Sequence, residues 1–171
     1  MAADRTSAGQ LLTFGCADQI YAFDIISVTD IIEVPEITRL PMVAEHILGI
    51  MNLRGKVVPV MDFAGRMGFP PQNYDEHSCI IVVDCEGALL GIKVPKVIDA
   101  EAYDPDEVSP SPVENSVITG YIELKGRRIS VIDCLAFSEK GKWPLIQYRR
   151  KEPNNTDDPQ RRRLFETCQA H

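Results

Sequence analysis

The stretch Ile47-Leu-Gly-Ile-Met-Asn-Leu-Arg-Gly-Lys-Val-Val-Pro-Val-Met-Asp-Phe63 decides the fold, because the chain repeats it. A related copy, Ile118-Thr-Gly-Tyr-Ile-Glu-Leu-Lys-Gly-Arg-Arg-Ile-Ser-Val-Ile-Asp-Cys134, follows at an offset of 71 residues without a gap. Within each copy, two apolar runs flank a basic residue and a glycine. Because glycine can supply the positive φ of a tight turn, this pattern predicts a β-hairpin in each copy.

The segments that precede the two copies also correspond, now at an offset of 69 residues. The matched positions include Leu12 and Ile81, Cys16 and Cys85, and Val28 and Val97. The chain therefore consists of two related halves, about residues 10–70 and 79–138. Two copies are too few for a solenoid, so the repeat favours two fused small barrels or a pseudo-symmetric pair of sheets.

Short runs rich in β-branched and aromatic residues, such as 11–14, 20–25 and 28–34, predict strands in each half. An aspartate follows each repeated hairpin, Asp62 in the first half and Asp133 in the second, and short runs of helix formers come next. We expect both to be N-caps of short helices. The connection 103–116 contains three prolines and is predicted to be a surface loop.

Charge is distributed unevenly along the chain. Residues 1–138 carry 10 Lys and Arg against 20 Asp and Glu, whereas residues 139–171 carry 8 against 5. An acidic body repels phosphate backbones, which argues against nucleic acid as a partner. Around a domain at 10–138 we expect a flexible N-terminus at 1–9 and a basic, partly flexible tail at 139–171.

Two features of the tail have alternative interpretations. The basic cluster Arg161, Arg162 and Arg163 could touch an anionic surface, but a solvated segment is the simpler interpretation. Trp143, Ile146 and Tyr148 are apolar enough to dock on the body of the protein.

No segment resembles a signal peptide, and no apolar run approaches the roughly 20 residues needed to cross a bilayer. We therefore expect a cytoplasmic protein without direct membrane insertion. The five cysteines form no CxxC pair and are odd in number, so reduced thiols are the simplest expectation.

Candidate catalytic and metal-binding groups are few. His77, Cys79 and Cys85 are the best metal candidates, but the two cysteines stand at either end of one predicted strand. Asp62 and Asp133 could be imagined as an acid and base pair, yet the repeat explains them as equivalent caps. The sequence indicates neither an enzyme nor a cofactor.

The stretch ILGIMNLRGKVVPVMDFAGRMG, residues 47–68, resembles the signature segment of the CheW family. In that segment a glycine, an Asn-Leu-Arg-Gly turn, a proline and an aspartate recur in this order. The runs Tyr21-Ala-Phe-Asp-Ile-Ile, Val28-Thr-Asp-Ile-Ile-Glu-Val and Leu90-Gly-Ile-Lys-Val also look like the family. The resemblance covers about residues 10–138.

The resemblance implies a mostly β fold with few short helices: two fused SH3-like five-stranded β-barrel subdomains over a shared core. It also implies a non-enzymatic adaptor without cofactors. Its partners would be the cytoplasmic tip of a chemoreceptor (a methyl-accepting protein) and the SH3-like regulatory domain of the CheA-type histidine kinase. The adaptor would be cytoplasmic and recruited to membrane-associated receptor arrays.

By position, Val28, Asp30, Gly49 and Arg54 match family residues associated with partner binding, and Gly91 and Val97 match the groove in the second half. Arg54 could hold a carboxylate in a two-pronged contact, with Asp30 as a candidate, or could simply be a turn residue. The family commonly has glutamate where Asp30 stands, so the Asp30 side chain is one methylene shorter and reaches less far toward Arg54. Val28 could equally be a core residue, and Gly49 a requirement of backbone geometry.

Two other functions remain open on the sequence alone. The same adaptor fold could serve a chemosensory-like pathway for surface motility, development or second-messenger output, or the chain could be a self-assembling β structural module. For the adaptor we expect Arg54→Ala or Gly49→Asp to weaken assembly while the fold survives. We expect removal of residues 149–171 to leave binding nearly intact.

Overall fold

The computed structural model describes residues 9–114 and 116–138. The predictions for the tail at 139–171, including docking of Trp143, Ile146 and Tyr148 and the role of the arginine cluster, lie outside this part of the chain. So does the predicted flexible N-terminus, apart from Gly9. That residue already belongs to the first strand, where it pairs with Tyr103.

Strands make up most of the described chain. In the first half they are β1 (Gly9–Cys16), β2 (Gln19–Asp24), β3 (Val28–Glu33), β4 (Ile47–Leu53) and β5 (Lys56–Asp62), with the 3-10 turn η1 (Ile25–Ser27) and the helix α2 (Phe63–Met67). In the second half they are β6 (Cys79–Cys85), β7 (Ala88–Val94), β8 (Lys96–Tyr103), β9 (Ser109–Pro110), β10 (Ile118–Leu124) and β11 (Arg127–Ile132), with η2 (Pro105–Glu107) and the helix α3 (Cys134–Ser138).

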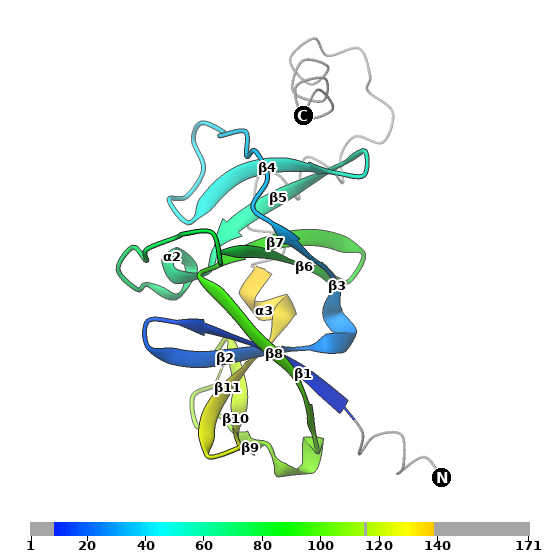
Figure 1. Cartoon of the computed structure of the whole chain (residues 1–171), viewed down its shortest axis with the longest axis vertical. Helices are drawn as coiled ribbons and strands as arrows, with labels where there is room; N and C mark the ends of the chain where they lie inside the picture. Colours follow the sequence, from blue (N-terminus) through cyan, green and yellow to red (C-terminus); the bar gives the residue numbers. More distant parts are fainter. Residues whose placement is uncertain (1–8, 115, 139–171) are drawn as a thin grey trace.

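The strands form two sheets, which lie one above the other in Figure 1. The five-stranded sheet has the order β3-β6-β7-β5-β4, and the six-stranded sheet has the order β8-β1-β2-β11-β10-β9. Both are mostly antiparallel, with one parallel pair each, β5 with β7 and β11 with β2. This arrangement confirms the predicted fold class, mostly β with two fused subdomains and few short helices, and β9 makes one of the two predicted five-stranded units a six-stranded sheet.

Neither sheet coincides with one half of the sequence. The hairpin β1-β2 of the first half lies in the six-stranded sheet, and its repeat β6-β7 lies in the five-stranded sheet. Replacing each strand by its repeat converts β3-β6-β7-β5-β4 into β8-β1-β2-β11-β10, which is the order observed. The halves have therefore exchanged their first two strands, and the two sheets are pseudo-symmetric.

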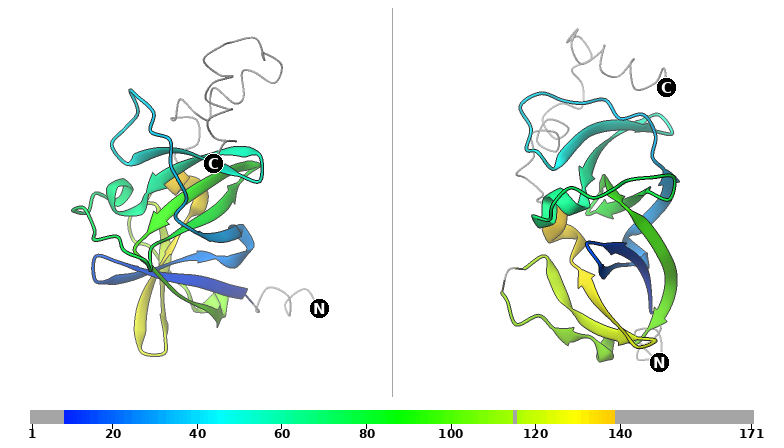
Figure 2. Two further views of the ribbon diagram at one scale, coloured as in Figure 1. Left: turned by 45° about the horizontal axis from the view of Figure 1, so that its top comes forward. Right: turned by 60° about the vertical axis from the view of Figure 1, so that its left-hand side comes forward.

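A shared apolar core joins the two sheets. It includes Phe14 and Phe23 from the six-stranded sheet, with Phe63 of α2 and Phe137 of α3, all fully buried. The Phe63 ring lies edge-on to Phe14 at 4.8 Å between centroids and is stacked with Phe137 at 5.3 Å. Figure 2 shows the two helices side by side between the sheets. Burial of each large aromatic stabilises the fold by roughly 2–3 kcal/mol, so this core fixes how the sheets sit together.

The repeated hairpins have the predicted tight turns. Arg54 and Gly55 have φ of 52° and 83°, and Lys125 and Gly126 have φ of 52° and 76°. Positive φ at both central residues is the geometry of a type I′ turn, whose twist matches that of the strands.

The predicted N-caps are also present. The Asp62 side chain accepts a hydrogen bond from the Gly65 backbone N–H, and the Asp133 side chain accepts from Leu135 and Ala136. Each cap satisfies N–H groups at the start of its helix that have no partner within the helix.

The connection 103–116 differs from the predicted loop in one respect. Ser109 and Pro110 form the short strand β9, which pairs with Tyr121 and Gly120 of β10 at the edge of the six-stranded sheet. A proline is compatible with this position because an edge strand leaves one side of its backbone unpaired. The proline content predicted a loop, but pairing with β10 makes two residues of this connection, Ser109 and Pro110, part of the sheet.

Candidate interaction surface

The pair that the sequence suggested, Asp30 and Arg54, is present. Arg54, at the tip of the β4-β5 hairpin, donates from both terminal nitrogens to the two carboxylate oxygens of Asp30 on β3, at 2.9 and 3.1 Å. The shorter aspartate therefore still reaches the arginine. The Arg54 side chain is 74% exposed, so this pair contributes little to folding stability and holds the guanidinium in a fixed, accessible position.

Val28 and Val97 occupy equivalent places at the beginning of β3 and β8. Both are half-buried and pack against the shared core between the sheets. In each strand the residue that follows the valine bulges out of the ladder, because the pairing steps from Val28 to Asp30 and from Val97 to Asp99. Each valine thus packs against the core and leaves part of its side chain exposed. For Val28, a core role and a role in partner binding are therefore compatible.

Gly49 is buried and required by backbone geometry. Its φ is 143°, and a Cβ at this position would lie 2.0 Å from the Thr38 carbonyl oxygen. That carbonyl accepts the Ile50 N–H at 2.9 Å, which closes the sheet next to β4. The expectation that Gly49→Asp would leave the fold intact is therefore wrong, because no side chain fits without breaking this pairing.

Gly91 is buried within the five-stranded sheet. An added Cβ would lie 3.0 Å from both Ile80 Cγ2 and Met51 Cε. The structure therefore brings Asp30 and Arg54 together at the surface, places Val28 and Val97 on one core, and leaves Gly49 and Gly91 as interior backbone positions of the sheet.

Two exposed apolar side chains flank Asp30 in the sequence at the edge of the five-stranded sheet. Ile26 on η1 is 86% exposed and Ile31 on β3 is 45% exposed. Because β3 is an edge strand, its outer backbone groups are not used by another strand of this sheet. The alternation of β3 could have revealed Ile31, but exposure of Ile26 depends on the turn that lifts it from the sheet.

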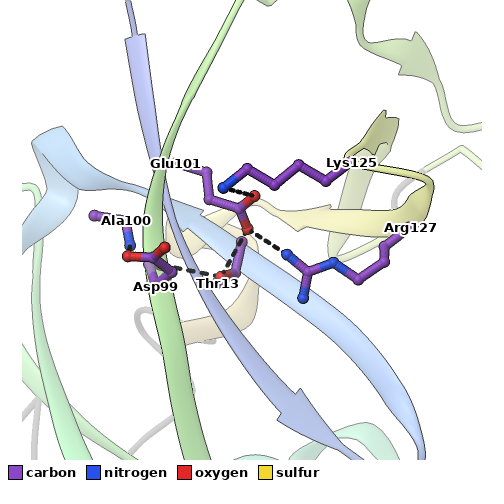
Figure 3. A network of polar contacts seen from close by, with 6 residues as sticks. All are labelled: Thr13, Asp99, Ala100, Glu101, Lys125 and Arg127. Carbon is purple, nitrogen blue, oxygen red and sulfur yellow. Dashed lines mark hydrogen bonds and ion pairs between the residues drawn. The ribbon is translucent and has the colours of Figure 1, made fainter.

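Sequence reasoning missed a buried charge cluster in the six-stranded sheet. Glu101 on β8 is only 4% exposed, and Thr13, Arg127 and Lys125 converge on it (Figure 3). Glu101 Oε2 lies 3.2 Å from Thr13 Oγ1 and accepts from Arg127 at 3.1 Å. Lys125 Nζ stands 3.8 Å from Oε1, which is too long for a hydrogen bond. Only the folded sheet places a buried carboxylate below Lys125.

A cavity of about 580 Å³ lies beside α3 and contains a second feature that the sequence did not reveal. Cys85 at the end of β6 and Cys134 at the start of α3 both line it, and their sulfurs are 3.2 Å apart. The Cys85 contact and burial raise the pKa of Cys134 well above its usual range. Neither cysteine forms a disulfide in the structure.

Tyr103 also lines this cavity and donates a hydrogen bond to Asp24 at 3.0 Å. Burial, with this hydrogen bond, raises the pKa of Tyr103 to about 12.

The groups considered for catalysis or metal binding do not converge. Cys79 and Cys85 stand at opposite ends of β6, roughly 20 Å apart at the usual rise of a strand, so they cannot share a metal with His77. Among the described residues, no group of three or more His, Cys, Asp or Glu has the arrangement of a metal site. Asp62 caps α2 and accepts a hydrogen bond from Tyr74, while Asp133 caps α3.

In the described ranges, no helix has both the length and the apolar character required to cross a membrane.

Comparison with known proteins relates the chain to one family. A model described as the CheW-like domain matches residues 10–141. The chemotaxis protein CheW of Rhizobium meliloti (strain 1021) is 28% identical over 129 residues, covering 72% of this chain and 83% of that protein. A probable chemotaxis protein CheW of Rhizobium etli is 30% identical over 136 residues, covering 76% and 88%.

A solved structure agrees with these matches. The crystal structure of the scaffolding protein TtCheW from Thermoanaerobacter tengcongensis superposes with a TM-score of 0.72 at 28% identity, covering 77% of this chain and 92% of that one.

Proposed function

This chain belongs to the CheW family and is an adaptor in chemotaxis signalling, and on that premise we propose that it joins two partners. These are the cytoplasmic tip of a chemoreceptor and the regulatory domain of a CheA-type histidine kinase. It acts as a non-enzymatic, cofactor-free scaffold in the cytoplasm, recruited to membrane-associated receptor arrays. The reported relatives carry chemotaxis names, which does not favour a non-swimming pathway.

The observation that carries the proposal is the edge of the five-stranded sheet. There Asp30 on the edge strand β3 holds the Arg54 guanidinium, and the next residue of the strand, Ile31, has an exposed side chain on the opposite face. A fixed charge and an exposed apolar side chain on one edge strand suit docking of a second β domain, because rigid strands lose little conformational entropy on binding. We assign this edge to the regulatory domain of the kinase.

We assign Val28 and Val97 to the receptor. They stand at pseudo-equivalent positions where the two sheets meet, and half-buried valines are suitable contacts for the apolar face of a helical hairpin. In this scheme Gly49 and Gly91 contribute through the backbone of β4 and β7 and make no direct contact.

A titration with a kinase regulatory domain and a receptor-tip fragment tests both assignments. We expect Arg54→Ala to weaken binding of the regulatory domain about tenfold while receptor binding is retained, as for loss of a fixed interfacial charge. Lys125→Ala, which alters the equivalent turn of the other sheet, is the matched control and should leave binding unchanged. If neither partner binds the unmodified chain, the adaptor assignment fails.

The self-assembling alternative predicts association without partners. Sedimentation of the purified chain distinguishes the two, because an adaptor of the kind proposed does not self-associate before a partner is added.

A further inference from the structure

Two cysteines from different parts of the fold meet beside the cavity at α3. Cys85 ends β6 of the five-stranded sheet, and Cys134 begins α3, which follows β11 of the six-stranded sheet. Their sulfurs are 3.2 Å apart, although the two residues are separated by 49 positions in the chain. A disulfide bond is about 2.05 Å long, so an approach of about 1 Å would bring the two sulfurs to bonding distance.

The pseudo-symmetric positions indicate that packing alone does not require two cysteines here. Cys85 corresponds to Cys16 of the first half, and Cys134 corresponds to Phe63 of α2. Phe63 is fully buried in the shared core, whereas Cys134 is half-buried and lines the cavity. The second half therefore has a pair of thiols where the first half has one thiol and one aromatic ring.

The environment of the pair favours reaction between the two sulfurs. The hydrogen bond with Cys85 and burial raise the pKa of Cys134 well above its usual range. Little of this thiol is therefore ionised at neutral pH, which slows its reaction with an oxidant. Once one sulfur is oxidised, the other lies beside it, and closure is fast because it is intramolecular. A slow first step and a fast second step favour a disulfide over sulfinic or sulfonic acid.

We propose that Cys85 and Cys134 form an oxidation site, at which hydrogen peroxide converts the two thiols into a reversible disulfide. One sulfur loses its proton and attacks a peroxide oxygen, so the O–O bond breaks and a sulfenic acid and hydroxide form. The other sulfur then displaces hydroxide from the sulfenic acid and the S–S bond forms. The two released protons convert both hydroxides to water, and the two electrons lost by the sulfurs reduce the peroxide. Exchange with two molecules of a small thiol restores both cysteines.

The disulfide would join β6 to α3 and so link the two sheets covalently. Because it closes a loop across 49 positions, it restricts the unfolded chain and should stabilise the oxidised protein. This inference is independent of the partners proposed above.

Peptide mapping of the full-length chain tests the link. The native protein is incubated with hydrogen peroxide, its remaining thiols are alkylated in denaturant, and a digest is analysed by mass spectrometry. We expect a peptide pair joined through Cys85 and Cys134 that disappears after reduction, while Cys16 and Cys79 remain thiols and are alkylated. Cys134→Ala should abolish the link. Absence of a link in the unmodified chain, or a link from either residue to a different cysteine, would overturn the proposal.

Two measurements on the unmodified chain separate native geometry from chance pairing. In the urea-unfolded chain all five cysteines compete, so the share of the Cys85–Cys134 link among disulfides should fall about fivefold. The oxidised native protein should also unfold at a higher urea concentration than the reduced protein, whereas Cys134→Ala should show no such shift. An equal share in the two states, or an unchanged urea midpoint after oxidation, would overturn the proposal.

Discussion

The two sheets share one strand order but differ in where their charged side chains lie. In the five-stranded sheet, Asp30 and Arg54 pair at the surface, and Ile32 continues the apolar interior. In the six-stranded sheet, the position equivalent to Ile32 is the buried Glu101. Duplication has therefore preserved hydrogen-bond register and turn geometry, while the side chains on that framework have diverged. Loss of the repeated glycine should therefore destabilise both sheets, whereas loss of a partner of the buried charge should destabilise only the six-stranded sheet.

The largest effect is expected at the repeated glycine of the second hairpin of each half. A Cβ would lie 2.0 Å from the Thr38 carbonyl oxygen at Gly49 and 2.4 Å from the Ser109 carbonyl oxygen at Gly120. Only Gly49 also has a φ in the positive range, at 143°. We expect Gly49→Ala to reduce the free energy of unfolding by roughly 4 kcal/mol and Gly120→Ala by roughly 2 kcal/mol, measured by urea denaturation. Equal losses would show that φ adds nothing to the steric clash.

The next largest loss of stability is expected for the partners of the buried Glu101 carboxylate. Arg127→Ala removes a hydrogen-bonded partner of Glu101 and should cost roughly 2–3 kcal/mol. Its equivalent in the other sheet, Lys56, is exposed, and Lys56→Ala should change the unfolding free energy by less than about 0.5 kcal/mol.

Glu101→Ile sharpens this test, because it installs the residue type of the other sheet. We expect a change within about 1 kcal/mol, since a buried ion pair can often be replaced by an apolar residue without loss. A loss as large as that of Arg127→Ala would mean that the carboxylate itself stabilises the sheet.

A smaller effect is expected at Tyr103, whose equivalent in the five-stranded sheet is Val34. Tyr103→Phe removes the hydrogen bond to Asp24 and should cost about 1 kcal/mol at neutral pH. The folded pKa of about 12 exceeds the ordinary value of 10.0, so this stabilisation persists below pH 10 and is lost as pH rises from 10 to 12. Chemical denaturation across that range should show a shallower decline in Tyr103→Phe, and parallel curves would contradict the assignment.

The smallest effect is expected at the two turn cations. Arg54→Ala and Lys125→Ala should each change the unfolding free energy by less than about 1 kcal/mol, because both side chains are largely exposed, at 74% and 70%. A thermal melt checks this directly. A larger loss for Lys125→Ala would indicate that its 3.8 Å contact with Glu101 is stronger than the geometry suggests.

Much of the fold could be predicted from the sequence because its signals are local. The Arg54-Gly55 and Lys125-Gly126 turns, and the caps at Asp62 and Asp133, depend on neighbouring residues. The exchange of hairpins between the sheets leaves no local signal, because either half could satisfy the same strand pattern.

For the candidate site, the sequence suggested the Asp30–Arg54 pair from side-chain chemistry, and the folded sheet brings the two together although β3 and the β4-β5 hairpin do not pair as strands. The Glu101 cluster could not be predicted, since it depends on which sheet receives β1 and therefore Thr13. The steric role of Gly49 was anticipated only as a preference for glycine. The size of the steric clash at this position depends on the Thr38 carbonyl, which lies in the β3-β4 connection, where the sequence shows no clear secondary-structure pattern.

The exchange of β1-β2 for β6-β7 has a consequence for any shortened version of this protein. A polypeptide carrying one half alone would expose an unpaired β5 or β11 flank, because the hairpin that covers it resides in the other half. Such a fragment could complete its sheets only by trading hairpins with a second identical fragment across a twofold axis. In this sense the full-length chain is a covalently fused, domain-swapped dimer, and its halves are inseparable although they read as separate repeats.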